Sequence, residues 1–223
     1  MITTAGRLGT SGFHTGLQWA APGEAIRIGQ QVAGNGDVVK APWLSLPEIA
    51  VLVRRPVIVN AVADLIGPDI ALEGGFLLTK RPAADFRVPW HQDGVGADME
   101  LDPERSVTVW MALTAATAGN GALRVIPGSH RHGYLPTRRE DPHGGQRGRA
   151  LTTDVPAGSP EPVVVPLAAG EAMAMDVRLL HSSPPNTSAQ PRIGLNLRYV
   201  APDAVTRRDG QEPQLYPIAG PSW

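Results

Sequence analysis

Two residues that could bind a metal ion lie close together in the segment WHQDG, at positions 90 to 94. His91 and Asp93 are two positions apart, so on a β-strand both side chains would point to the same face. A neutral imidazole and a carboxylate are suitable ligands for a divalent metal ion. The pair alone is weak evidence, because the same spacing also occurs among unrelated surface residues.

A third possible ligand, His181, begins the segment HSSPPN, and Arg192 follows eleven positions later. Two histidines and one carboxylate form a ligand face that leaves positions on iron open for a chelating co-substrate and for dioxygen. An arginine guanidinium can bind a carboxylate of that co-substrate through paired hydrogen bonds. Together, these residues predict a non-haem iron site with a dicarboxylate beside it.

The order of short motifs resembles the phytanoyl-CoA dioxygenase-like family of Fe(II)- and 2-oxoglutarate-dependent oxygenases. The resemblance covers roughly residues 43 to 200 and rests on the segments WHQDG, VWMAL, GALRVIPGSHRHG, GEAMAMD and HSSPPNTSAQPR. It implies a mainly β fold with flanking helices, namely a double-stranded β-helix of the jelly-roll, cupin-like type. It also implies a dioxygenase with Fe(II) as cofactor and 2-oxoglutarate as co-substrate.

The resemblance assigns His91, Asp93 and His181 to the metal ion as the catalytic residues. The alternative is that they are unrelated polar residues, which the ordered neighbouring motifs argue against. Halogenating relatives have Ala or Gly at the position of Asp93. The carboxylate in this chain therefore favours an oxygenase or an oxidative cyclase.

The remaining candidate residues are assigned to 2-oxoglutarate. Arg192 would bind the distal carboxylate, and Ser183 would donate its hydroxyl to the same group. Trp110 would form a wall of the pocket, and Thr79 would supply a hydrogen bond. Trp110 and Thr79 could also be ordinary core or strand-surface residues.

The segment that begins at Arg192 alternates strictly between polar and apolar residues. On a strand, one face would carry Arg192, Gly194, Asn196 and Arg198, and the other Ile193, Leu195 and Leu197. The polar face could point to water. Because a site with a metal ion and an anion is also polar, we expect this face to point into the barrel.

The composition fits one domain over residues 1 to 223, with 42% hydrophobic residues and a formal net charge of −1. This charge gives no reason to expect a nucleic acid or an anionic membrane as partner. The chain has no cysteine, which excludes disulfides and zinc-thiolate sites. The N-terminus lacks the pattern of a signal peptide and no apolar run could span a bilayer, so we expect a soluble cytoplasmic protein.

The hydrophobic pattern predicts a few helices followed by many strands. Residues 1 to 42 are expected to be an irregular arm with one edge strand at 25 to 28. Capping-box spacing predicts a short helix from Ser45 to Pro56, and a second helix should span 57 to 66. Strands are expected at 70 to 80, around 91, and at 106 to 114, 121 to 126, 162 to 167, 172 to 177 and 192 to 200. Residues 131 to 160 have no hydrophobic period and are expected to be a lid over the barrel mouth.

The substrate is expected to be a small polar molecule. The chain resembles the small antibiotic-tailoring members of the family, among them the orthosomycin-type oxygenases, which implies hydroxylation or oxidative ring closure of a glycosidic intermediate. The residues expected at the mouth are Asn196, Arg198, Asp98, Glu100, Asp102 and Glu104. The four acids could instead form a solvated loop. Alternative functions are a cupin-type metal-dependent isomerase or hydrolase, and a non-enzymatic carbohydrate-binding jelly roll. The sequence does not indicate an oligomeric state.

Overall fold

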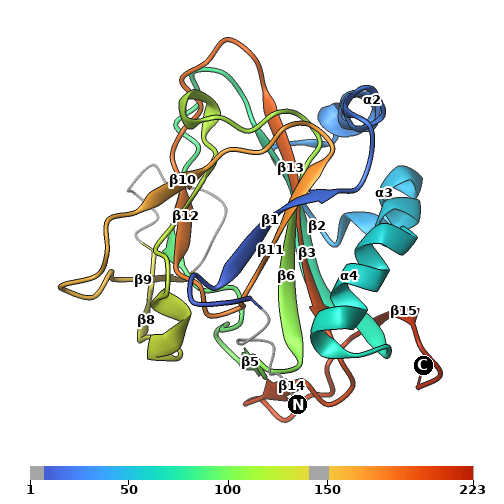
Figure 1. Cartoon of the computed structure of the whole chain (residues 1–223), viewed down its shortest axis with the longest axis vertical. Helices are drawn as coiled ribbons and strands as arrows, with labels where there is room; N and C mark the ends of the chain where they lie inside the picture. Colours follow the sequence, from blue (N-terminus) through green and yellow to red (C-terminus); the bar gives the residue numbers. More distant parts are fainter. Residues whose placement is uncertain (1–7, 141–150, 223) are drawn as a thin grey trace.

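A large antiparallel sheet forms the centre of the computed structural model, which describes residues 8–140 and 151–222 (Figure 1). Its strand order is β1-β11-β6-β13-β3-β15, and β2 also pairs with β3. The strands are β1 Phe13–Gln18, β2 Val38–Lys40, β3 Ile70–Lys80, β6 Ser106–Ala112, β11 Glu171–Met175, β13 Arg192–Val200 and β15 Tyr216–Ala219. The longest expected strands, at 70 to 80 and 192 to 200, are therefore confirmed.

A smaller sheet faces the large one and has the order β10-β7-β12-β4. Its strands are β4 Val88–His91, β7 Leu123–Val125, β10 Val163–Val165 and β12 His181–Ser183. A cluster of buried apolar residues joins the sheets, with Trp110 and Met173 from the large sheet and Leu123, Val125 and Val165 from the small one. Two facing antiparallel sheets around one core form the expected double-stranded β-helix.

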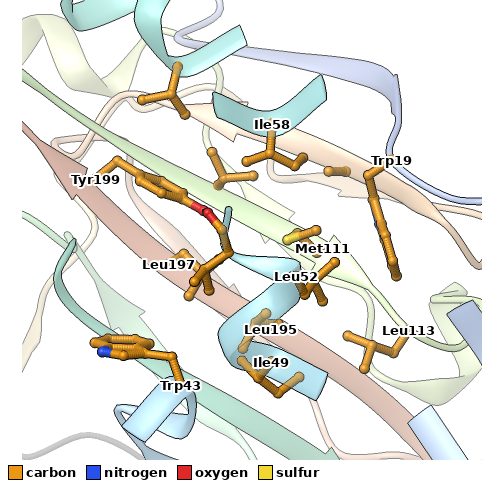
Figure 2. Packing of buried hydrophobic residues seen from close by; sticks show 14 of the residues in the cluster. Trp19, Trp43, Ile49, Leu52, Ile58, Met111, Leu113, Leu195, Leu197 and Tyr199 are labelled. Atoms are coloured by element: carbon orange, nitrogen blue, oxygen red, sulfur yellow. The ribbon is translucent and has the colours of Figure 1, made fainter. Parts of the chain in front are cut away.

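Helices cover the outer face of the large sheet (Figure 1). They are α2 Pro22–Val32, α3 Pro47–Leu52 and α4 Pro56–Ile66, with the 3₁₀ helix η2 at Pro42–Leu44. Each of the three α-helices has a proline in its first turn, where the missing N–H costs no hydrogen bond. Figure 2 shows Ile49 and Leu52 of α3 beside Leu195 and Leu197 of β13, and Ile58 of α4 belongs to the same apolar cluster.

Two details of the helical layer differ from the expectation. Residues 25 to 28 belong to α2 rather than to an edge strand, because Ala25, Gly29 and Val32 recur at helical spacing and are buried together. The N-terminal arm instead contains two strands, β1, which pairs with β11, and β2, which pairs with β3. Ser45 does not cap a helix, since α3 begins at Pro47 with Leu46 in the cap position.

The segment between β7 and β10 contains more regular structure than expected. It includes the 3₁₀ helix η4 Ser129–His132 and a two-stranded sheet of β8 Thr137–Arg139 and β9 Leu151–Thr153. The middle of the expected lid, at 141 to 150, lies outside the described residues. Thr152 donates a hydrogen bond to the carbonyl of Trp90 at 2.9 Å, which ties this segment to β4 beside His91.

The remaining short elements lie at the ends of the barrel. The strands β5 and β14 pair with each other, and the 3₁₀ helices η1 and η3 lie in connections. Their bounds are β5 Met99–Leu101, β14 Val205–Arg207, η1 Ala33–Asn35 and η3 Ala118–Asn120. Within the described ranges, no helix is long and apolar enough to cross a membrane.

Candidate active site

The three expected metal ligands meet inside the barrel. His91 ends β4 and His181 begins β12, and the two residues are direct partners in the small sheet. Their rings are 4.0 Å apart between centroids. Nε2 of His91 lies 3.6 Å from Oδ1 of Asp93, and Nε2 of His181 lies 3.5 Å from Oδ2. These spacings are close to the roughly 3 Å between neighbouring ligands of one ion bound at about 2.1 Å.

Backbone carbonyls orient both imidazole rings. Nδ1 of His91 lies 2.7 Å from the carbonyl oxygen of Pro89, and Nδ1 of His181 lies 2.9 Å from that of Leu179. A carbonyl oxygen only accepts hydrogen bonds, so Nδ1 is the protonated nitrogen in each ring. This tautomer directs the Nε2 lone pairs toward Asp93, as a metal site requires.

Two polar side chains hold the carboxylate of Asp93. The hydroxyl of Thr108 on β6 donates to Oδ2 at 3.1 Å, and Nδ2 of Asn196 on β13 donates to the same oxygen at 3.0 Å. The sequence suggested Asn196 only as part of the mouth and did not suggest Thr108. The period of two along β6 could have indicated Thr108, because it shares a strand face with Trp110.

Arg192 is fully buried and lacks a carboxylate partner in the described residues. One Nη2 hydrogen bond goes to the carbonyl of Gly121, while Nε and Nη1 are buried and have no acceptor among the described residues. The guanidinium carbon lies 5.1 Å from the ring centre of Trp110. Burial lowers the pKa of Arg192 to about 10. A buried guanidinium with unused donors is suited to bind an anion.

A narrow pocket, here called the inner pocket, connects the His-Asp-His group to Arg192. Ser183 and Trp110, two of the residues assigned to 2-oxoglutarate from the sequence, line this pocket. The other lining residues are Phe76, Leu78, Val88, His91, Asp93, Leu123, His181, Ser182, Arg192 and Asn196. A small dicarboxylate would reach the metal-binding residues with one end and Arg192 with the other.

Thr79 does not line the inner pocket, which corrects the expected role of this residue. Phe76 and Leu78 of β3 face the pocket, so the strand alternation turns Thr79 to the opposite face. The neighbour of Thr79, Lys80, was not expected at the site. Its buried Nζ donates to the carbonyls of Ser183 at 2.9 Å and Phe86 at 3.1 Å, and to that of Pro184.

A second cavity, here called the outer cavity, shares Asp93 and Phe76 with the inner pocket and has a volume of about 300 Å³. It is lined by Glu73, Phe76, Asp93, Val95, Gly96, Ala97, Met99, Arg139, Leu151 and Arg198. Leu151 and Arg139 come from β9 and β8, so the segment expected as a lid contributes to this cavity. The cavity is large enough for a small organic molecule.

The acids expected at the mouth, Asp98, Glu100, Asp102 and Glu104, do not line the outer cavity. Met99 points into the cavity and Leu101 is buried, so the alternation along β5 turns Glu100 outward, where it pairs with Arg208 at 2.9 Å. Of the expected polar residues, Arg198 does line the outer cavity, and its acidic partner is Glu73.

Comparison with known proteins gives a consistent family. The model of the phytanoyl-CoA dioxygenase (PhyH) family matches residues 25–194. A phytanoyl-CoA dioxygenase of Arabidopsis thaliana is 29% identical over 153 residues, which are 67% of this chain and 46% of that protein. An L-proline trans-4-hydroxylase of Streptomyces griseoviridis is 30% identical over 171 residues, which are 66% of this chain and 61% of that protein. The chain thus spans about half to three fifths of the length of these relatives.

Solved structures share the fold over nearly the whole chain. The apo form of the non-heme monooxygenase ThoJ is 26% identical with a TM-score of 0.80, covering 97% of this chain and 84% of that chain. EvdO2 from Micromonospora carbonacea var. aurantiaca is 26% identical with a TM-score of 0.71, covering 92% of both chains. The carbocyclase SnoK from nogalamycin biosynthesis, at 23% identity and a TM-score of 0.70, covers 96% of this chain and 91% of its own and shows a likeness of fold alone.

Proposed function

Because the chain belongs to the phytanoyl-CoA dioxygenase family, we propose that it is an Fe(II)- and 2-oxoglutarate-dependent oxygenase that uses its inner pocket for both groups. The observation that carries this proposal is that Arg192 is buried with hydrogen-bond donors that have no acceptor among the described residues. Within the part of the chain that the structure describes, its Nε and Nη1 are buried without an acceptor, at the end of a pocket that begins at three grouped residues able to bind a metal ion. A dicarboxylate co-substrate would satisfy both donors and reach the metal ion.

Different residues would bind the metal ion and the co-substrate. His91, Asp93 and His181 would hold Fe(II), whose reaction with 2-oxoglutarate and dioxygen supplies the oxidising power for attack on a C–H bond. Arg192 and the hydroxyl of Ser183 would bind the distal carboxylate. Trp110 stacks over the guanidinium and excludes water from it, which strengthens the charge-assisted hydrogen bonds.

The outer cavity is the proposed substrate site, because it adjoins Asp93 but is not lined by Arg192. We propose a small polar, glycosidic natural-product intermediate, which the enzyme hydroxylates or closes into a ring, orthoester formation included. Support for this comes from the polar pair Glu73 and Arg198 in the cavity and from the likeness to EvdO2.

The alternatives are a cupin-type isomerase or hydrolase and a carbohydrate-binding jelly roll. Neither requires a buried arginine with unused donors at the end of a metal-binding pocket.

We further propose that residues 1 to 223 form one domain, in which 131 to 160 form an insert over the mouth. The described part of this insert supports the proposal through Arg139 and Leu151, which line the outer cavity.

The proposal is tested by anaerobic addition of Fe(II) and 2-oxoglutarate to the purified protein. The expected result is a weak visible metal-to-ligand charge-transfer band that is lost in His91→Ala, Asp93→Ala and His181→Ala. The variant His132→Ala, which changes an exposed histidine, serves as the control and should keep the band. Without a band in folded wild-type protein that still binds zinc, the isomerase or hydrolase function would be preferred.

A further inference from the structure

The outer cavity contains an ion pair that the binding of iron and 2-oxoglutarate does not use. Nε of Arg198 donates to Oε2 of Glu73 at 2.6 Å, and the two side chains are only 10% and 17% exposed. The guanidinium carbon also lies 5.6 Å from the ring centre of Phe76. Burying two charges is costly and often adds little stability, so a pair at this position calls for a function.

A β-bulge in β3 brings Glu73 to the cavity. Arg198 pairs with Gly74, and the next residue of β13, Tyr199, pairs with Leu72, so Glu73 has no partner in the ladder. Leu72 packs in the core under the helices, whereas Phe76 faces the cavity. Strict alternation would turn position 73 to the helices along with Leu77. The bulge breaks this alternation and lets Glu73 line the cavity beside Arg198.

A glycine makes room for the guanidinium at the same place. A Cβ atom on Gly74 would lie 2.0 Å from Nη2 of Arg198, so any side chain there would displace the guanidinium. The bulge at Glu73 and the glycine at 74 are neighbours, and both serve the same pair. Two local departures from regular strand structure thus build one polar site, as is common next to active sites.

The pair retains hydrogen-bonding capacity toward the cavity. Among the described residues, Arg198 donates only through Nε and Glu73 accepts only through Oε2. The two Nη groups of Arg198 and Oε1 of Glu73 therefore remain for a ligand. Apolar side chains form the adjoining wall, namely those of Phe76, Val95, Met99 and Leu151.

We propose that the outer cavity binds a neutral ring compound with adjacent hydroxyl groups, such as a cyclic polyol or a glycoside, through Glu73 and Arg198. Adjacent hydroxyls can both donate to Glu73 and accept from Arg198, while the C–H face of the ring packs on the apolar wall. An anion would meet the carboxylate of Glu73, and a plain acyl chain would leave both charges unpaired. The inference rests on the proposed function and names the substrate class and the residues that select it.

Binding is measured by calorimetry on the full chain, both metal-free and loaded anaerobically with Fe(II) and 2-oxoglutarate. The probes are phenyl β-D-glucopyranoside, phenyl β-D-glucuronide and hexanoate, which represent a neutral polyol, its anionic counterpart and an acyl chain. We expect the glucoside to bind most tightly. Glu73→Gln and Arg198→Gln should each lower the affinity for the glucoside about tenfold or more, because each removes a charged hydrogen-bonding partner.

The matched control is Asp209→Asn, which removes the carboxylate of a different arginine–carboxylate pair, Arg207 and Asp209, outside the outer cavity. This variant should leave the affinity for the glucoside unchanged. Gly74→Ala gives a second variant that keeps both charges. It should weaken the binding of the glucoside, because the added methyl group displaces Arg198. Thermal unfolding of each variant shows whether it is folded.

Two results would overturn the proposal. One is that the glucuronide or hexanoate binds more tightly than the glucoside, and that this binding is lost in Arg139→Gln and kept in Glu73→Gln. The other is no binding of the glucoside to folded wild-type protein in either state. The charge-transfer band reports separately on the iron chemistry, so glucoside binding without the band would count against the proposed function and not against the role of this pair.

Discussion

Asn196 and Asp93 lie 103 positions apart in the chain and are joined by a buried hydrogen bond of 3.0 Å from Nδ2 to Oδ2. Asn196 lies on β13 between Arg192 and Arg198, and all three side chains point into the barrel. One strand thus contacts the proposed 2-oxoglutarate end of the inner pocket, the carboxylate of Asp93 and the outer cavity. Asn196 and Thr108 fix the orientation of a proposed metal ligand and should matter for metal affinity.

The first prediction is that Thr108→Val lowers the affinity for Fe(II) by about tenfold to a hundredfold, the usual effect of losing a partner of a metal ligand. Val has nearly the shape of Thr but cannot donate to Asp93. Anaerobic titration with Fe(II), or with Co(II) as a spectroscopic substitute, measures the change. Thr206→Val changes an exposed threonine on β14 and serves as the control. Equal affinities in the two variants would mean that Asn196 alone is enough to orient Asp93.

The alternation of residues along β13 could be predicted from the sequence alone. Ile193, Leu195 and Leu197 pack under the helices, and the polar residues between them point into the barrel, as expected. A strict period of two leaves few alternatives once one face must be buried. The grouping of His91, Asp93 and His181 could be predicted because their spacing and neighbouring motifs are specific.

Other features could not be predicted because they depend on irregularities that the sequence does not reveal. The bulge at Glu73 reverses the alternation in β3, so a period of two assigns this residue to the wrong face. The outward direction of Glu100 depends on the pairing of β5 with β14, a strand that lies about a hundred residues later in the chain. Residues 25 to 28 form one turn of a helix, and so short an apolar run fits a strand equally well.

The second prediction concerns Arg192. Arg192→Gln should weaken 2-oxoglutarate binding by on the order of 2–5 kcal/mol, because it removes a charged donor from a buried carboxylate. The charge-transfer band, titrated with 2-oxoglutarate, gives the dissociation constant directly, and the KM should rise in parallel. Arg105→Gln, at an exposed arginine, is the control. Unchanged binding in Arg192→Gln would show that another cation holds the distal carboxylate.

The third prediction concerns the contact between Gly194 and Trp110. A Cβ atom at position 194 would lie 2.3 Å from Cζ2 of Trp110, so Gly194→Ala must displace the indole ring from Arg192. Overpacking of this kind costs about 1–3 kcal/mol of unfolding free energy and should also weaken 2-oxoglutarate binding. Chemical denaturation measures the loss. The double variant Gly194→Ala with Trp110→Phe should recover part of it, because the smaller ring leaves space for the methyl group. No recovery would place the strain elsewhere in β13.

The last prediction concerns Lys80, which lies beside Arg192 and, among the described residues, donates only to backbone carbonyls. Burial, with a smaller effect of the charge on Arg192, lowers the pKa of Lys80 to about 6. In the unfolded chain a lysine has a pKa of about 10.4. Between these values the unfolded state binds more protons than the folded state. Stability should therefore rise with pH across this window, by up to about 1.4 kcal/mol per pH unit.

Lys80→Met should remove this contribution, because methionine cannot be protonated. Urea unfolding of the metal-free protein between pH 6.5 and 9, with wild type and variant compared at each pH, isolates the effect from other titrating groups. We expect the stability of the variant relative to wild type to fall steadily as the pH rises. A difference that does not change with pH would mean that the carbonyls of Phe86, Ser183 and Pro184 keep the ammonium charged in the folded state. In that case Lys80 would be a permanent second cation next to the proposed carboxylate site.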